Sequence, residues 1–271
     1  MRELGWVHSE RHDGAVTDPY AVAAEDIDAV VFDIGGVFAI RHPVPIRRGL
    51  ARAGFEVSAD DADFHVAHHH AVRRLADESM DDLHEHSPEF WVHFEREYLA
   101  RIGVAEEQLM DGVRAMREEV FLKEPKPIWS YLLHDNIAGF HRIAALRPVA
   151  IVSNNDGTAA QQMEDFGICQ VGVGQLPSAA AIVDSTVIGI SKPDPRIFAP
   201  ALAALGTDPA RTLYVGDTVH ADVRGSRAAG MPVCHLDPYD LHNDYDHWRL
   251  PGLQALADHL SGVEVTSAAG S

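Results

Sequence analysis

The sequence contains little that would cross-link the chain or hold it at a charged or apolar surface. It has only two cysteines, Cys169 and Cys234, both in apolar surroundings, so it favours a reducing compartment over a disulfide framework. A formal charge of −19 argues against a broad electrostatic grip on nucleic acid or an anionic membrane. The sequence shows no secretory h-region and no apolar run of membrane-spanning length. We therefore expect a cytoplasmic protein with neither nucleic acid nor a membrane as its partner.

What the chain does have is enough apolar material for a sizeable core. Of its 271 residues 46% are hydrophobic, which is typical of a globular protein of one large or two smaller domains. From Ile46 to Leu122 the strand-like runs disappear, and aromatic and aliphatic residues recur at helical spacing between Phe90 and Leu99. The proline-bearing segments 41–45 and 123–127 read as linkers around this block. We predict one domain formed by residues 1–45 and 123–271, with residues 46–122 inserted as a helical cap.

Outside the insert, strand-like and helical patterns alternate. The segments that read as strands are 28–34, 149–153, 169–173, 181–184, 212–215 and 232–236. The segments that read as helices are 128–146, 157–166, 196–205 and 222–229. Such alternation is typical of an α/β fold, and it predicts a doubly wound, Rossmann-like core with a parallel sheet.

Three of the predicted strands end in polar residues. They deliver Asp33, Ser153 and Asp217 directly after apolar runs, and Gly35 and Gly36 follow the first run as a turn. Because parallel strands in such a sheet point the same way, we expect their ends to meet at one edge. Each residue also has an ordinary structural role open to it, such as capping or hydrogen bonding within a turn.

A fourth segment, Ser191 to Pro195, places Lys192 just before a helix that Asp194 would cap and Pro195 would begin. A buried carboxylate cluster repels itself unless a cation relieves it, and Mg²⁺ is commonly held by carboxylates together with phosphate oxygens. Asp33 would then be free to act as a nucleophile. The alternatives are that Lys192 is a solvated surface residue and that Asp222 is a helix N-cap.

These motifs, in this order, resemble those of the haloacid dehalogenase (HAD) superfamily of hydrolases. The resemblance extends from residue 28 to about residue 260, with a helical cap inserted after the first motif. Its most specific parts are I-S-K-P-D-P-R-I-F from Ile190 and V-G-D-T-V-H-A-D-V-R-G-S-R-A-A-G-M from Val215. It implies a helical-cap, phosphatase-type hydrolase that forms an aspartyl-phosphate.

The resemblance also implies roles for individual residues. Asp33 would be the nucleophile, and it would share the Mg²⁺ with Asp217 and the backbone carbonyl of Gly35. The residues that would bind the phosphoryl group are Ser153, Asn154 and Lys192. Asp222 would support the metal or pair with Lys192.

One position departs from the family pattern. Phosphatases of the family usually carry a second aspartate two residues after the nucleophile, as general acid and base, and this chain has Gly35 there. Loss of such a group typically costs ~10²–10⁴-fold in rate. The substrate would then need a good leaving group, such as an acyl or anomeric phosphate, or a histidine such as His42 or one from the cap would substitute. A third alternative is a weakly active or inactive relative with a binding or regulatory role.

Among active alternatives, a metal-independent dehalogenase is the main rival of a phosphatase. Gly216 and Asp217, which such dehalogenases usually lack, favour the phosphatase. Phosphonoacetaldehyde hydrolases use a cap lysine, and the chain has none between Phe38 and Leu122. We therefore expect a Mg²⁺-dependent phosphatase of a small phosphorylated metabolite, as a monomer or homodimer.

The cap is rich in histidine. His65, His68 and His69 would share one helix face, which is compatible with a transition-metal site. No cysteine or carboxylate partner stands at the spacing of a known metal motif, so we expect instead a solvated, histidine-rich helix face.

Overall fold

A seven-stranded sheet forms the centre of the structure, a computed structural model that describes residues 18–76, 88–125 and 127–262. Its strand order is β5-β6-β4-β1-β7-β8-β9, and every neighbouring pair is parallel. The strands are β1 (Ala29–Phe32), β4 (Val149–Ser153), β5 (Gln170–Val171), β6 (Ser178–Asp184), β7 (Thr212–Gly216), β8 (Val233–Leu236) and β9 (Trp248–Leu250). The predicted parallel α/β sheet is therefore confirmed.

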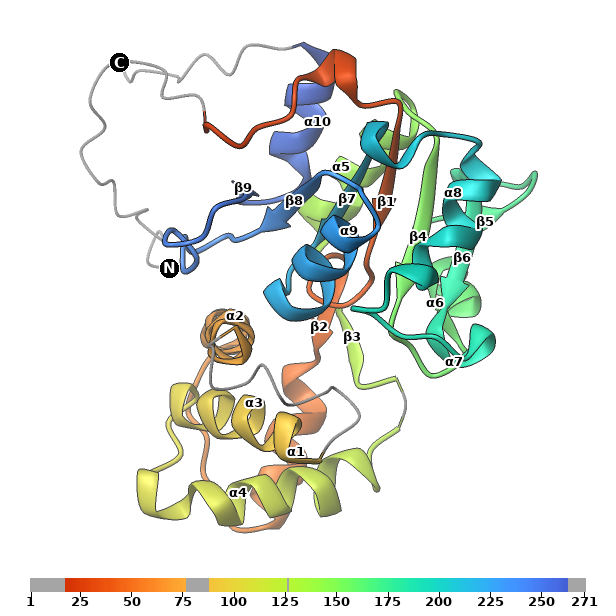
Figure 1. Cartoon of the computed structure of the whole chain (residues 1–271). Helices are drawn as coiled ribbons and strands as arrows, with labels where there is room; N and C mark the ends of the chain where they lie inside the picture. Colours follow the sequence, from red (N-terminus) through yellow and green to blue (C-terminus); the bar gives the residue numbers. More distant parts are fainter. Residues whose placement is uncertain (1–17, 77–87, 126, 263–271) are drawn as a thin grey trace, which may run out of the picture.

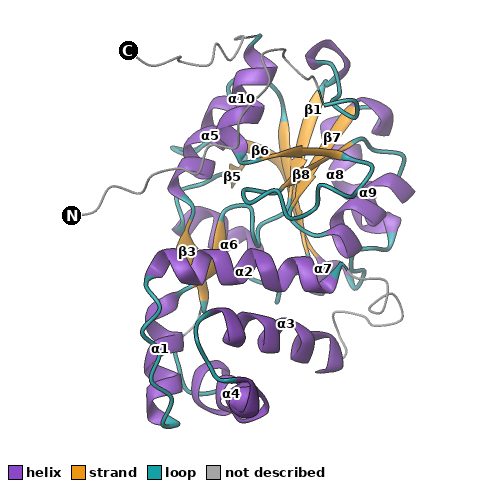
Figure 2. Ribbon diagram, turned by 90° about the vertical axis from the view of Figure 1, so that its left-hand side faces the viewer, coloured by secondary structure: helices purple, strands orange, loops and turns teal. Residues whose placement is uncertain are grey.

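Helices cover both faces of this sheet (Figure 2). They are α5 (His134–Ala144), α6 (Ala159–Asp165), α7 (Ser185–Ile188), α8 (Ala199–Leu205), α9 (Arg224–Ala228) and α10 (Leu253–Ser261). Single turns lie at Ala24–Asp26, Pro195–Phe198, Pro209–Arg211 and Val219–Val223. Figure 2 shows α5 and α10 on one side of the strands and α8 and α9 on the other, which is the doubly wound arrangement.

The two sides have separate apolar cores because side chains alternate along each strand. In β1, Val30 and Phe32 belong to the core under α5 and α10, whereas Val31 belongs to the core under α8. The apolar run from residue 29 to residue 32 is thus buried on both faces, as its composition predicts.

The helical part of the chain packs separately, below the sheet in Figure 1. It contains α1 (Pro43–Arg52), α2 (Asp61–Leu75), α3 (Pro88–Arg101), α4 (Leu109–Ala115), a short turn at Glu106–Gln108 and a π-helical turn at Met116–Phe121. Its own apolar core draws on residues 46 to 128. Two short antiparallel strands, β2 (Ala39–Arg41) and β3 (Trp129–Leu132), connect it to the sheet. The domain boundaries at 45/46 and 122/123 remain a prediction.

The predicted linker at residues 41–45 is wrong. Arg41 ends β2, and α1 begins at Pro43 with the side chain of His42 accepting a hydrogen bond from the Val44 amide. Proline is tolerated in the first helical turn, where its missing N–H has no intrahelical partner to lose. Two prolines therefore start this helix and do not exclude it.

The predicted helix at 128–146 is also wrong in its first half. Residues 129–132 form β3, and only residues 134–144 are helical. The strand exists because Tyr131 and Leu132 pair with Ile40 and Ala39, more than 90 positions away in the chain. A pairing at such distance leaves no local signal. Helix α10 and strand β9, near the C-terminus, were not predicted at all.

Other elements agree with the sequence. Gly206 ends α8 in the left-handed conformation, and the Asp194 side chain caps the turn that Pro195 begins. The structure describes helix α3 from Pro88 onward, and Ser87 lies outside the described residues. Within the described residues, no helix is both long and apolar enough to cross a bilayer.

A glycine at the contact of α5 and α10 gives a test of the packing. A Cβ on Gly139 would lie 2.5 Å from the backbone carbon of Leu253. Gly139→Ala should therefore destabilise the fold by ~1–3 kcal/mol, even though alanine in a helix ordinarily gains about 1 kcal/mol over glycine. Urea denaturation measures this change. Ala138→Gly, at the exposed neighbouring position, reports the ordinary helix-propensity effect, and a stabilised Gly139→Ala protein would contradict the packing.

Candidate active site

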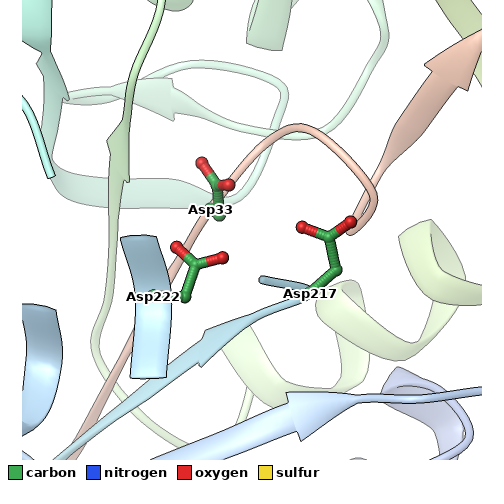
Figure 3. A group of neighbouring side chains, drawn as sticks. All are labelled: Asp33, Asp217 and Asp222. Atoms are coloured by element: carbon green, nitrogen blue, oxygen red, sulfur yellow. The ribbon is translucent and has the colours of Figure 1, made fainter. Parts of the chain in front are cut away.

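The three predicted polar strand ends come from neighbouring strands. In the order β4-β1-β7, Asp33 follows the middle strand, Ser153 ends one neighbour and Asp217 follows the other. Asp33, Asp217 and Asp222 each offer a carboxylate oxygen within 4.8 Å of the others. Figure 3 shows the three side chains as neighbours. The sheet therefore brings together the residues whose convergence the sequence predicts.

Lys192 lies inside this cluster and not at the surface. Its Nζ is 2.9 Å from Asp33 Oδ1 and 2.7 Å from Asp222 Oδ1. It also donates to the Tyr214 hydroxyl at 2.9 Å. An ammonium group has three N–H donors, so these three oxygens fix its position. The alternative of a solvated lysine is excluded, since the side chain is only 2% exposed.

Asn154, predicted to bind phosphate, has its side chain committed elsewhere. Its Oδ1 accepts the Lys192 amide at 2.8 Å, and its Nδ2 donates to the Lys192 carbonyl at 3.1 Å. The side chain thus holds the backbone of Lys192 on both sides. This geometry supports a role of the Asn154 side chain in positioning the lysine.

Asp222 is fully engaged by hydrogen bonds. One oxygen receives Lys192 and the Tyr214 hydroxyl (2.9 Å), and the other receives the amide and hydroxyl of Thr218 at 2.9 and 2.7 Å. Burial acts to raise the pKa of Asp222, but Lys192 and Thr218 outweigh it and the pKa is lowered. Asp222 therefore holds Lys192 in place, and the N-cap of the following turn is Thr218 and not Asp222. Tyr214 and Thr218 were missed because a strand tyrosine and a turn threonine carry no motif of their own.

Two glycines are required by the carboxylates next to them. Gly36 has φ of +64°, and a Cβ there would lie 1.8 Å from Asp217 Oδ2. A Cβ on Gly216 would lie 2.3 Å from Asp222 Cγ. Gly35 is different, because its Cβ would meet only the ring of Trp129, at 3.5 Å. The missing second aspartate is thus not excluded by lack of space at its Cβ.

The two carboxylates that face the site carry an electrostatic cost. Burial raises the pKa of Asp33, and Asp222 raises it further, although Lys192 and Ser153 act in the opposite direction. Burial, Asp222 and Asp33 together raise the pKa of Asp217 well above its usual value of 3.8. In the protein without a bound cation, both groups resist ionisation, because one lysine cannot balance three buried carboxylates.

The cap histidines are not a solvated face, so that expectation is wrong. His68 and His69 are buried, and burial lowers the pKa of both well below 6.5. His68 reaches the site, with Nε2 3.5 Å from Asp217 Oδ2, whereas His42 caps α1 and lies outside the cavity lining. His65 Nδ1 lies 2.6 Å from the Tyr239 hydroxyl. Among the described residues, these histidines do not form a three-ligand metal group. Two further histidines of the predicted cap, His84 and His86, lie outside the described residues.

A second histidine pair, also missed, supports the backbone at Asp217. His235 Nε2 lies 2.8 Å from the Asp217 carbonyl, and its Nδ1 lies 2.8 Å from His247 Nε2. A carbonyl oxygen only accepts, so His235 donates from Nε2, and its Nδ1 accepts the proton of His247 Nε2. Burial lowers the pKa of His235 to about 3 and that of His247 to about 4, so both rings are neutral at physiological pH.

A cavity of about 1030 Å³ opens onto this cluster. Asp33, Ser153, Lys192 and Asp217 line one end of it, together with Gly35. Side chains of α2 and α3 line the opposite wall. The site therefore offers one nucleophilic carboxylate, a second carboxylate, a hydroxyl and an ammonium at one end of a cavity, which suits attack on an anionic electrophile.

Neutralising Asp217 should stabilise the cation-free protein. The folded-state pKa of Asp217 is raised, so its ionisation destabilises the fold as pH rises above the ordinary carboxyl pKa. In EDTA, Asp217→Asn should raise the free energy of unfolding by ~1–4 kcal/mol at pH 7 and by much less near pH 4. Denaturant melts at both pH values measure this difference.

A buried carboxylate with the opposite shift serves as the control. Asp237 accepts the amides of Leu241 and His242 at 2.9 and 2.8 Å, and its pKa is lowered to about 2. Asp237→Asn should therefore destabilise the protein at pH 7. Equal losses of stability in the two variants would contradict the raised pKa of Asp217.

Comparison with known proteins gives a consistent result. A family model described as haloacid dehalogenase-like hydrolase matches residues 27–230. The chain is 32% identical over 142 residues to a phosphoserine phosphatase of Thermus thermophilus, covering 52% of each chain. It is 46% identical over 55 residues to a glyceraldehyde 3-phosphate phosphatase of Methanopyrus kandleri, covering 20% of this chain and 24% of that protein. The chain thus spans about half or less of the length of these two relatives.

Among solved structures, a HAD hydrolase of Bacillus subtilis, YfnB bound to magnesium, has a TM-score of 0.52 at 16% identity. The match covers 86% of this chain and 98% of that one, and it indicates a shared fold. The parallel sheet, the converging strand ends and the family match over residues 27–230 lead to one conclusion: the chain belongs to the haloacid dehalogenase-like hydrolases.

Proposed function

We propose that this protein is a magnesium-dependent phosphatase that acts on a small phosphate monoester through an aspartyl-phosphate on Asp33. The observation that carries the proposal is the position of the Asp33 carboxylate at the end of the central strand. The Asp33 carboxylate lies between the Nζ of Lys192, 2.9 Å from its Oδ1, and a second carboxylate, that of Asp217. It faces a cavity. The curated relatives named as phosphatases support the same reaction class.

The residues present fit a magnesium ion. Asp33 and Asp217 offer hard oxygen ligands, and burial together with neighbouring carboxylates raises the pKa of each, which a bound cation would relieve. Asp222 has both oxygens occupied by hydrogen bonds, so Asp33, Asp217 and the Gly35 carbonyl would hold the ion. Bound Mg²⁺ would supply the missing charge and neutralise phosphate oxygens.

The chain's own groups can carry out the remaining chemistry. A carboxylate oxygen of Asp33 attacks phosphorus, and the bond from phosphorus to the leaving oxygen breaks with its electron pair. Lys192 and the Ser153 hydroxyl balance charge on the phosphoryl oxygens. Water then cleaves the aspartyl-phosphate, releasing phosphate and restoring Asp33. Asp222 and Tyr214 keep Lys192 aimed at this point throughout.

The helical part would act as a cap. Helices α2 and α3 line the wall opposite Asp33, so their closure would exclude water from the reacting groups. We propose residues 46–122 as the cap and residues 1–45 and 123–271 as the core. We also propose that the protein is cytoplasmic and is a monomer or homodimer.

Two other functions remain as rivals. A metal-independent dehalogenase would gain nothing from a second buried carboxylate, and without a cation, burial, Asp222 and Asp33 raise the pKa of Asp217. A catalytically inactive binding protein would not need Lys192 held against a carboxylate at 2.9 Å. Both observations favour the phosphatase.

Removal of the nucleophile tests the proposal. Asp33→Asn should lower kcat for 4-nitrophenyl phosphate by at least ~10³-fold, because the amide cannot attack phosphorus. EDTA should abolish wild-type turnover and Mg²⁺ should restore it. Steady-state absorbance assays measure both effects.

The control is Asp28→Asn, which changes a carboxylate at the opposite end of β1 that pairs with Arg211. It should retain turnover. Beryllium fluoride with Mg²⁺ should raise the melting temperature of the wild type strongly and that of Asp33→Asn little. Turnover that survives both EDTA and Asp33→Asn would overturn the phosphatase proposal, and a wild type unaffected by the fluoride would favour the binding protein.

The glycine at position 35 permits a gain-of-function test. Because the Gly35 Cβ position is open, Gly35→Asp would place a proton donor next to the leaving group. We expect kcat for glycerol 1-phosphate to rise ~10–100-fold, with little change for 4-nitrophenyl phosphate, whose leaving group needs no proton. Gly35→Asn, of the same shape, should give no gain. An equal rise for both esters would argue against a missing general acid.

A further inference from the structure

The wall of the cavity that faces Asp33 is strongly apolar. Aromatic side chains from α3, from the turn after α4 and from β3 line it, among them Trp91, Phe94, Phe121 and Trp129, and His68 of α2 is its polar member. Val72 and Leu75 of α2 extend the same surface. Aromatic and aliphatic walls bind a ligand by removing apolar surface from water, and they offer no partner to a charged or hydroxyl-rich group.

The core side of the cavity is polar, but its polar side chains bond to one another. Asn155 donates to Gln162 at 3.0 Å, Thr158 to Asp156 at 2.6 Å and Gln161 to Asp165 at 2.8 Å. These bonds occupy part of the hydrogen-bonding capacity of this wall, so a ligand hydroxyl would compete with them. The polar groups therefore lie on the core side of the cavity, whereas the wall that faces Asp33 is mainly apolar.

Positive charge is also scarce around the leaving-group end. Among the described lining residues Lys192 is the one lysine or arginine, and it is held by Asp33, Asp222 and Tyr214. The nearest cation behind the aromatic wall is Arg41, only 3% exposed, with NH1 2.7 Å from Glu95 and its guanidinium 4.4 Å from the centroid of Phe94. It is therefore neutralised and enclosed. A second anionic group on the substrate would meet Asp156 and Asp165 instead.

The reacting end sets a further condition. With Gly35 in place of an acid, the leaving oxygen must depart without a proton from that position, which favours leaving groups of low pKa. A phenolic oxygen, with a pKa near 10, meets this condition far better than an alkyl alkoxide. The apolar wall and the missing acid thus select the same kind of molecule.

We propose that the substrate is a phosphate monoester of an uncharged, aromatic alcohol, whose ring lies against Trp91, Phe94 and Trp129 while its phosphate faces Asp33. This inference rests on the proposed phosphatase function and names the substrate class of that site. It distinguishes the protein from phosphatases of carboxylated or polyhydroxylated metabolites, whose substrates would leave a charge or several hydroxyls against an apolar wall.

A matched series of esters on the wild-type protein tests it with Mg²⁺. 2-Naphthyl phosphate and phenyl phosphate have leaving groups of similar acidity, so their ratio reports apolar contact, and we expect naphthyl to lead by about tenfold in kcat/KM. 4-Carboxyphenyl phosphate has the more acidic leaving group, yet its charge should place it about tenfold or more below phenyl phosphate. Glucose 1-phosphate and glycerol 1-phosphate should be slower than phenyl phosphate and 2-naphthyl phosphate.

Variants locate the effect on the wall. Trp91→Ala should bring the ratio of naphthyl to phenyl close to one, chiefly through KM, and Trp91→Phe should retain most of it. Phe55→Ala is the matched control, since Phe55 packs in the same helical core but does not line the cavity. It should leave the ratio unchanged.

The outcomes separate this inference from the proposed function. Highest kcat/KM for glucose 1-phosphate, glycerol 1-phosphate or the carboxylated ester would overturn the aromatic substrate class while leaving the phosphatase intact. A naphthyl-to-phenyl ratio at or below one would do the same. Absence of Mg²⁺-dependent turnover for every ester, including 4-nitrophenyl phosphate, would remove the phosphatase and this inference with it.

Discussion

The single ammonium group of Lys192 holds this site together. Three carboxylates from β1 and from the segment after β7 converge within 4.8 Å in a buried space, and Lys192 contacts two of them directly. Like charges at such separation in a weakly polarisable interior repel strongly, so the cluster tolerates no further loss of positive charge. The hydrogen bonds that Lys192 donates to Asn154, Tyr214 and Asp222 fix it where it compensates most. The remaining negative charge is the basis of the proposed Mg²⁺ site.

This electrostatic arrangement also constrains the backbone. Gly36 and Gly216 give the room that Asp217 and Asp222 occupy, because a Cβ at either position would overlap a carboxylate. Gly35 and Gly36 therefore have different roles, although they are adjacent in the sequence. Gly36 is required by the turn and by Asp217. A Cβ at Gly35 would meet the ring of Trp129 at an ordinary contact distance, so space does not require glycine there. The missing side chain at position 35 instead changes the chemistry of the site.

The sequence predicted the sheet and the convergence well, because both follow from local patterns and from one rule about parallel strands. Long β-branched runs gave β1, β4 and β7, and their order in the sheet made Asp33, Ser153 and Asp217 neighbours. What it could not predict depends on distant partners. β3 forms only because β2 pairs with it, and the cap histidines are buried only because α2 packs against other parts of the chain. Local periodicity contains neither fact.

The C-terminal part of the chain shows how far the site extends beyond its motifs. The family match ends at residue 230, yet His235 donates a hydrogen bond to the carbonyl of Asp217 and accepts one from His247. The Asp217 carbonyl fixes the tautomer of His235, and His235 in turn fixes the tautomer of His247. Tyr239 and Tyr245, from the loop after β8, reach His65 and the Ala76 carbonyl at the far end of α2. Strand β8 thus contacts the backbone that carries the carboxylate, and the loop after it contacts the helix that lines the opposite wall, so both sides of the cavity depend on residues beyond the family match.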